Sequence, residues 1–136
     1  MHGSETTPAT GVPFGLDRIR QLWVTAHDLG RATAYYRDVL GIRFLFEVPG
    51  KMAFFDCGGI RLMLAPPDKP EYDHASSILY FQVQDIAAAH ATLTGRGVAF
   101  ETEPHKVAEM PDHDLWLADF HDSEGNLHAL LSEVRR

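Results

Sequence analysis

The sequence has little positive charge, a single cysteine and no long hydrophobic run. Of its 136 residues, 12 are Lys or Arg and 19 are Asp or Glu, which gives a formal net charge of −7. This balance disfavours binding to a phosphate backbone, so we expect no nucleic-acid partner. One cysteine, Cys57, excludes a disulfide within the chain.

No apolar run approaches the ~20 residues that span a bilayer, and the first residues lack the basic and apolar blocks of a signal peptide. We therefore expect a cytoplasmic protein that has no membrane partner. The composition, 45% hydrophobic and 23% charged, is typical of a globular domain. At this length, folding buries roughly two-thirds of the accessible surface, which is enough for a core of its own.

Two stretches of the chain resemble each other: VTAHDLGRATAYYRDVLGIRF (24–44) and FQVQDIAAAHATLTGRGVAF (81–100). Each has a β-type run, an aspartate, an alanine-rich stretch with helical spacing, and a glycine followed by a new β-type run. Asp28 and Asp85 stand where helix N-caps are expected, and Gly41 and Gly97 where the helices should end. This self-similarity predicts a duplicated structural unit.

The later parts of the two units also match. GGIRLMLAPP (58–67) aligns with EGNLHALLSE (124–133), which places Met63 on Ala129. Two more β-type runs precede each of these strands: IRFLFEV and KMAFFDC in the first unit, VAFETEP and DLWLADFH in the second. We therefore predict an α+β fold in which two βαβββ modules in tandem form a cleft between curved mixed sheets. The predicted ranges are a flexible tail (1–15), the first module (16–67), a linker (68–76) and the second module (77–134), together one domain.

Side chains alternate along a strand, so the sheet face opposite the helix can be deduced from sequence parity. That face mixes apolar side chains with polar ones, including Arg61 and Thr102. Aromatic residues on a buried face most often fill a core, but a sealed core rarely accepts so many polar groups, so the mixture favours a ligand cleft. The predicted ligand-binding residues are Gln21, Trp23, Phe46, Met63, Tyr80, Gln82, Leu117 and Asp119.

Within that cleft, Trp23 and Tyr80 would form an aromatic platform for a flat or cationic ligand. Asp119 is expected beside Ala129 on the neighbouring strand, where its charge would orient a cationic group of the ligand. An ion pair between Asp119 and Arg61 is the structural alternative.

The paired helix entries HDLGRATAYYRDVLGIRF and QDIAAAHATLTGRGVAF, together with the turn FHDSEGN, resemble the vicinal oxygen chelate superfamily. That superfamily includes glyoxalases, bleomycin-resistance proteins and dioxygenases. In its metal-dependent members, four positions hold a divalent ion, and the resemblance places these positions at Gln21, Met63, Ile78 and Ala129. Only Gln21 can supply a donor that a hard ion accepts. We therefore expect no metal at the usual position and no other cofactor.

The resemblance implies a binding protein for a small, partly aromatic molecule, of the bleomycin-resistance type, and a homodimer, because members of this superfamily usually pair. The alternative is a metal-dependent lyase, isomerase or dioxygenase with a relocated site. Such a site would use Gln21, Asp119 and His121, or a pair formed by His105 and His113 across a hairpin. Asp119, His121, His105 and His113 are accordingly the catalytic candidates.

Overall fold

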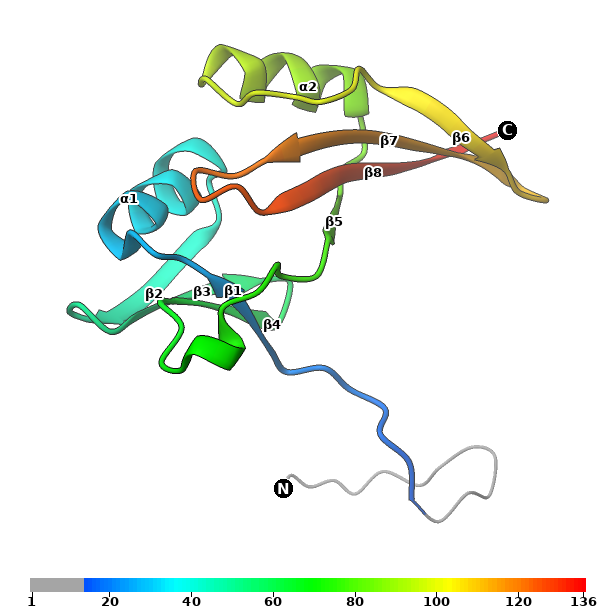
Figure 1. Ribbon diagram of the computed structural model, residues 1–136. Helices are drawn as coiled ribbons and strands as arrows, with labels where there is room; N and C mark the ends of the chain where they lie inside the picture. The colour runs from blue at the N-terminus through cyan, green and yellow to red at the C-terminus, as the bar shows by residue number, and fades with distance from the viewer. Residues whose placement is uncertain (1–13) are drawn as a thin grey trace.

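The computed structural model describes residues 14–136, and most of the predicted tail, residues 1–13, lies outside this range. The first module comprises β1 (Gln21–Thr25), α1 (Leu29–Ala34), a π-helical turn η1 (Tyr35–Val39), β2 (Arg43–Val48), β3 (Met52–Cys57) and β4 (Ile60–Ala65) (Figure 1). A linker containing the short 3-10 helix η2 (Pro70–Tyr72) follows. The second module comprises β5 (Leu79–Gln82), α2 (Ile86–Gly95), β6 (His105–Glu109), β7 (His113–His121) and β8 (Leu127–Arg135).

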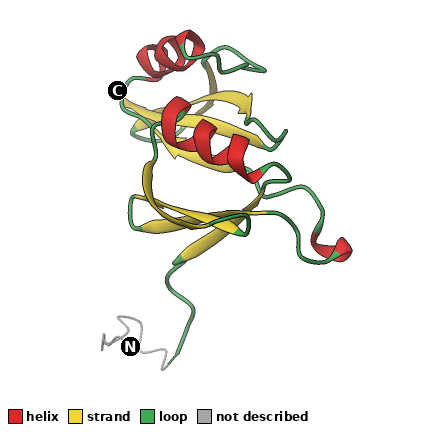
Figure 2. Cartoon of the chain, turned by 90° about the vertical axis from the view of Figure 1, so that its left-hand side faces the viewer, coloured by secondary structure: helices red, strands yellow, loops and turns green. Residues whose placement is uncertain are grey.

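Each module builds one four-stranded sheet, in the orders β1-β4-β3-β2 and β5-β8-β7-β6. The first strand of each module pairs in parallel with the last, and the other pairs are antiparallel. The prediction of an α+β fold with two βαβββ modules is therefore confirmed. The sheets do not close on each other within the chain, because α1 lies between them (Figures 1 and 2).

The predicted helix starts are confirmed. The carboxylate of Asp28 accepts a hydrogen bond from the backbone N–H of Arg31 at 3.1 Å, and that of Asp85 accepts one from Ala88 at 3.0 Å. Both aspartates therefore satisfy amides that the first turn of a helix leaves without partners. Gly41 follows the first helical segment with φ of 71°, a conformation that favours glycine.

The prediction of a strand over VAFETEP (98–104) is wrong. Phe100 makes only an isolated bridge to Phe120, and β6 begins later, at His105. The hairpin turns at Met110, whose N–H donates to the carbonyl of His113 at 2.8 Å. Proline cannot donate a hydrogen bond to a strand ladder, so Pro111 is suited to this turn. The residues KVAE (106–109), which precede the turn, are part of β6.

Two hydrophobic cores meet at the first helical segment. One core lies between α1 and the first sheet and includes Tyr36, Phe55 and Leu62. The other lies between α2 and the second sheet and includes Phe120 and Leu130. Tyr35 and Leu40 pack against both cores, so the η1 region joins the modules. The opposite face of each sheet, called the outer face below, is left uncovered by either helix.

Candidate functional site

The outer face of the first sheet carries an apolar row that crosses all four strands. The strand register aligns Trp23 with Met63, Met63 with Phe54, and Phe54 with Phe46. The Phe46 and Phe54 rings are 4.7 Å apart, and Phe46 is 49% exposed. Phe54 itself is buried, so the surface that this row offers to a ligand or to another protein face comes mainly from its neighbours Phe46, Met63 and Trp23.

Polar groups form the neighbouring row on the same face, where Arg61 is aligned with Gln21 and with Asp56. The guanidinium of Arg61 donates from Nε to Oε1 of Gln21 at 2.8 Å and lies 5.5 Å from the centre of the Phe54 ring. The amide of Gln21 in turn approaches Sδ of Met63 at 3.9 Å. Arg61 is thus bonded to a neighbour on its own sheet, and the alternative ion pair with Asp119 is not formed in the described residues.

The outer face of the second sheet is more polar. Asp119 lies directly across from Ala129, as predicted, and Tyr80 flanks Ala129 on the other side. The next row holds Gln82 and Leu117, both aligned with Leu131. Tyr80 is 54% exposed, so this face also presents an aromatic ring together with a carboxylate.

The eight predicted ligand-binding residues therefore form two groups on separate sheets. The first sheet holds Gln21, Trp23, Phe46 and Met63, and the second holds Tyr80, Gln82, Leu117 and Asp119. The expected platform of Trp23 and Tyr80 is not formed within the chain, because α1 separates the sheets. Instead, the Trp23 ring packs edge-on against Tyr72 of the linker, with centroids 6.1 Å apart.

The candidate histidines do not assemble into a site within the chain. His105 aligns with Leu117, whereas His113 lies at the turn and aligns with Arg135. Leu117 lies four residue steps along the strand from His113, about 13 Å, so the hairpin keeps the two histidines apart. His113 contacts Asp112 instead, at 2.7 Å.

His121 shares the outer face with Asp119 and approaches Glu101 at 3.8 Å. Gln21, the third member of the proposed relocated set, belongs to the other sheet. Over residues 14–136, no group of three or more His, Cys, Asp or Glu side chains is placed to hold a metal ion.

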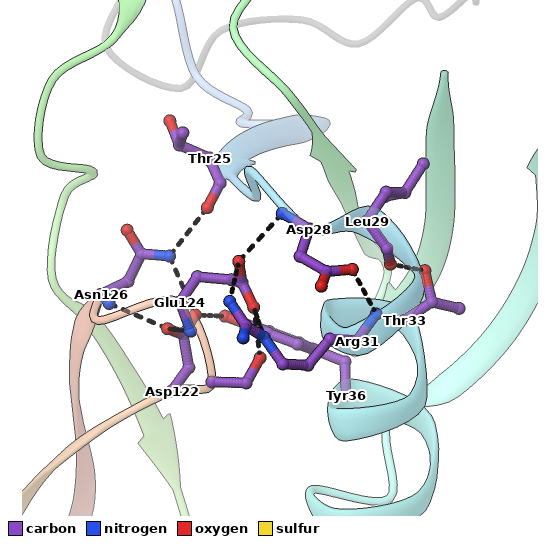
Figure 3. Close-up of polar contacts among 10 residues, drawn as sticks. Thr25, Asp28, Leu29, Arg31, Thr33, Tyr36, Asp122, Glu124 and Asn126 are labelled. Atoms are coloured by element: carbon purple, nitrogen blue, oxygen red, sulfur yellow. Dashed lines mark hydrogen bonds and ion pairs between the residues drawn. The ribbon is translucent and has the colours of Figure 1, made fainter. Parts of the chain in front are cut away.

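A buried polar cluster joins the modules, and no sequence pattern indicated it. The hydroxyl of Tyr36 donates to Oδ2 of Asp122 at 2.5 Å and lies 2.7 Å from Nε2 of His128. Since the single hydroxyl proton goes to Asp122, the N–H of His128 donates to the Tyr36 oxygen. Asn126 donates to the same carboxylate at 2.9 Å (Figure 3).

These contacts shift two pKa values. Burial alone raises the pKa of Asp122, but His128, Tyr36 and Asn126 outweigh it and lower this pKa from 3.8 to about 2. Burial and the negative charge of Asp122 raise the pKa of Tyr36 well above its usual range. At neutral pH the cluster therefore holds a carboxylate and a neutral phenol.

A second set of bonds ties the turn between β7 and β8 to the first module (Figure 3). Glu124, whose side chain is buried, accepts from Nε of Arg31 at 2.8 Å and from the N–H of Asp28 at 3.1 Å. Asn126 donates to the carbonyl of Thr25 at 2.9 Å. This turn is the quoted FHDSEGN motif, so its acidic and amide residues hold the two modules together.

Comparisons with known proteins agree with this architecture. The profile of the Glyoxalase/Bleomycin resistance protein/Dioxygenase superfamily matches residues 15–130. A lactoylglutathione lyase from Agrobacterium tumefaciens is 21% identical, with a TM-score of 0.70 over 87% of this chain and 95% of that one. A superfamily member from Sphaerobacter thermophilus is 22% identical, with a TM-score of 0.72 over 87% and 98%.

A virulence protein from Salmonella typhimurium shares the fold as well, at 18% identity and a TM-score of 0.72 over 89% of this chain and 100% of that one. No curated protein matches the chain in sequence. In residues 14–136, no helix has both the length and the apolar character needed to cross a membrane. The profile match covers most of the chain, so the chain belongs to the Glyoxalase/Bleomycin resistance protein/Dioxygenase superfamily.

Proposed function

We propose that this protein binds a small, partly aromatic molecule on the outer faces of its sheets, without the metal that many superfamily members use. The observation that carries the proposal is the position of Met63. This residue stands where the resemblance expects a metal ligand, and it lies instead in an apolar row between Trp23 and Phe54. Methionine fills irregular apolar space and suits a surface that contacts rings.

The donor set does not fit a divalent ion at the usual position. Met63, Ile78 and Ala129 offer no oxygen or nitrogen side-chain donor, and a catalytic site normally has three protein ligands. The remaining member, Gln21, has its amide oxygen bonded to Arg61. The alternative function, metal-dependent catalysis at a relocated site, rests on Asp119, which stands across from Ala129 and is thus one strand from a usual ligand position.

A metal titration tests this proposal. Purified protein is dialysed against Mn²⁺ or Zn²⁺, freed of excess ion, and its bound metal is measured by mass spectrometry. We expect far less than one ion per chain. The matched comparison is the double variant Met63→Glu with Ala129→Glu, which restores two carboxylates and should increase the bound metal. One ion per wild-type chain that is lost in Asp119→Asn would instead support the relocated site.

We also propose a homodimer in which the first sheet of one chain faces the second sheet of another. The open faces expose Phe46 and Tyr80, and burying apolar surface of this kind favours association. Such a pairing would complete a cleft that the single chain leaves open. Light scattering at tens of micromolar should give twice the chain mass of 15.2 kDa. A monomeric mass would contradict the pairing.

A further inference from the structure

The linker between the modules contacts β1, near which it lies in Figure 1. Its Tyr72 meets Trp23 at an interplanar angle of 82°. The indole of Trp23 is held in place, because its Nε1–H donates to the carbonyl of Ala65 at 3.0 Å. The two rings therefore form a fixed aromatic corner at the linker end of the first sheet.

The linker is anchored to the first module at two further points. The N–H of Thr25 donates to Oγ of Ser76 at 3.0 Å. Just after β1, Nε2 of His27 lies 2.8 Å from Oδ1 of Asp73. A wall that is held by Asp73 and Ser76, both shortly after Tyr72, needs little ordering when a ligand binds, which favours affinity.

A cavity of about 350 Å³ opens at this corner. Ligand pockets span about 300–1,000 Å³, so the space suits a molecule of one or two rings. The residues that line it include Trp23 and Tyr72 together with the polar residues His74, Ser76 and Ser77. Aromatic walls facing a few hydrogen-bonding groups are typical of a small-molecule site.

The polar wall indicates what the ligand must carry. Nδ1 of His74 lies 3.1 Å from the carbonyl of Ala75, so in the neutral ring it is the donor and Nε2 is left as an acceptor. The hydroxyls of Ser76 and Ser77 can both donate and accept. On the other side, the ammonium of Lys69 lies 5.6 Å from the centre of the Tyr72 ring, which disfavours a cationic ligand.

We infer that the linker and Trp23 form a subsite for a neutral, planar aromatic molecule that carries a phenol-type hydroxyl. The ring packs against Trp23 and Tyr72, and the hydroxyl proton is donated to Nε2 of His74. The ligand class rests on the proposed function, whereas the position of the subsite rests on the linker geometry alone.

The test is an NMR titration of the full chain with 2-naphthol. The protein has two tryptophans, Trp23 and Trp116, and therefore two indole N–H signals, which the variant Trp116→Phe assigns. Trp116 lies in β7 of the other module and serves as an internal reference. We expect the Trp23 signal to shift and saturate, while the Trp116 signal stays in place.

Variants of the linker provide the decisive comparison. Tyr72→Ala should weaken 2-naphthol binding about fivefold, Tyr72→Phe should retain the affinity, and His74→Ala should weaken binding by a similar factor. Naphthalene, which lacks the hydroxyl, should bind wild-type protein several-fold more weakly than 2-naphthol. Phe14→Ala removes an exposed ring outside the subsite and should change nothing.

Wild-type affinity in both Tyr72→Ala and His74→Ala would overturn the subsite. If Tyr80→Ala then lost the affinity, the ligand would lie on the second sheet, so the proposed function would stand and the linker subsite would not. A Trp23 signal that does not move at saturating 2-naphthol would also overturn the subsite. An absence of shifts at any outer-face residue would contradict the proposed function itself.

Discussion

Replacing Asp122 by asparagine should make the stability of this protein much less dependent on acid pH. The carboxylate has a pKa of about 2 in the folded chain against 3.8 as its ordinary value. A depressed pKa contributes stability that is fully present above the unfolded value and is lost as pH falls through the folded value. This difference between the two pKa values contributes about 2 kcal/mol to the free energy of unfolding at neutral pH.

Urea unfolding, followed by tryptophan fluorescence at pH 7, 5 and 3, measures this contribution. Asp122→Asn should be less stable than wild type by about 2 kcal/mol at pH 7, and the gap should narrow to about half of that at pH 3. The matched control is Asp38→Asn, which removes an exposed carboxylate paired with Arg37 and should have little effect. A gap that is equal at pH 7 and pH 3 would refute the reasoning.

Three further substitutions test the fold by the same urea assay at pH 7. Tyr36→Phe removes the hydroxyl that joins Asp122 and His128, and it should lower the free energy of unfolding by about 1–3 kcal/mol. Unchanged stability would mean that the buried cluster does not stabilise the fold. Phe55→Ala empties a fully buried position and should cost about 3–5 kcal/mol, whereas a loss below 1 kcal/mol would place this ring outside the core. Gly59→Ala, at a φ of 92°, should cost about 1 kcal/mol, and unchanged stability would contradict the turn geometry.

The features that could be predicted from sequence are those set by neighbouring residues. Asp28 and Asp85 cap their helices through bonds to amides three residues ahead, so the local pattern was sufficient. The outer face of each strand followed from alternation, and the alignment of Asp119 with Ala129 is confirmed by the register. Duplication of this pattern made the family resemblance, and hence the fold, predictable.

The features that could not be predicted depend on contacts between distant segments. Tyr36 and Asp122 are 86 residues apart, and nothing local to either shows that they bond. The expected pairing of His105 and His113 across a hairpin required the two residues to face each other at its neck, but the turn occurs at Met110, next to His113 only. A shift of a few residues in the position of a hairpin turn changes every cross-strand pair, so histidine spacing alone could not define a site.

The polar cluster also explains why the outer faces are left open. Tyr36 lies in the π-helical turn that continues α1, and its hydroxyl bonds to the turn after β7. Glu124 and Asn126 add bonds from that turn to Arg31 and to the end of β1. These bonds hold the helix side of one module against the second, so the outer faces point away from this junction. The cleft that we propose between outer faces would then be completed by a second chain, which is why oligomeric state and ligand binding should be measured on the same sample.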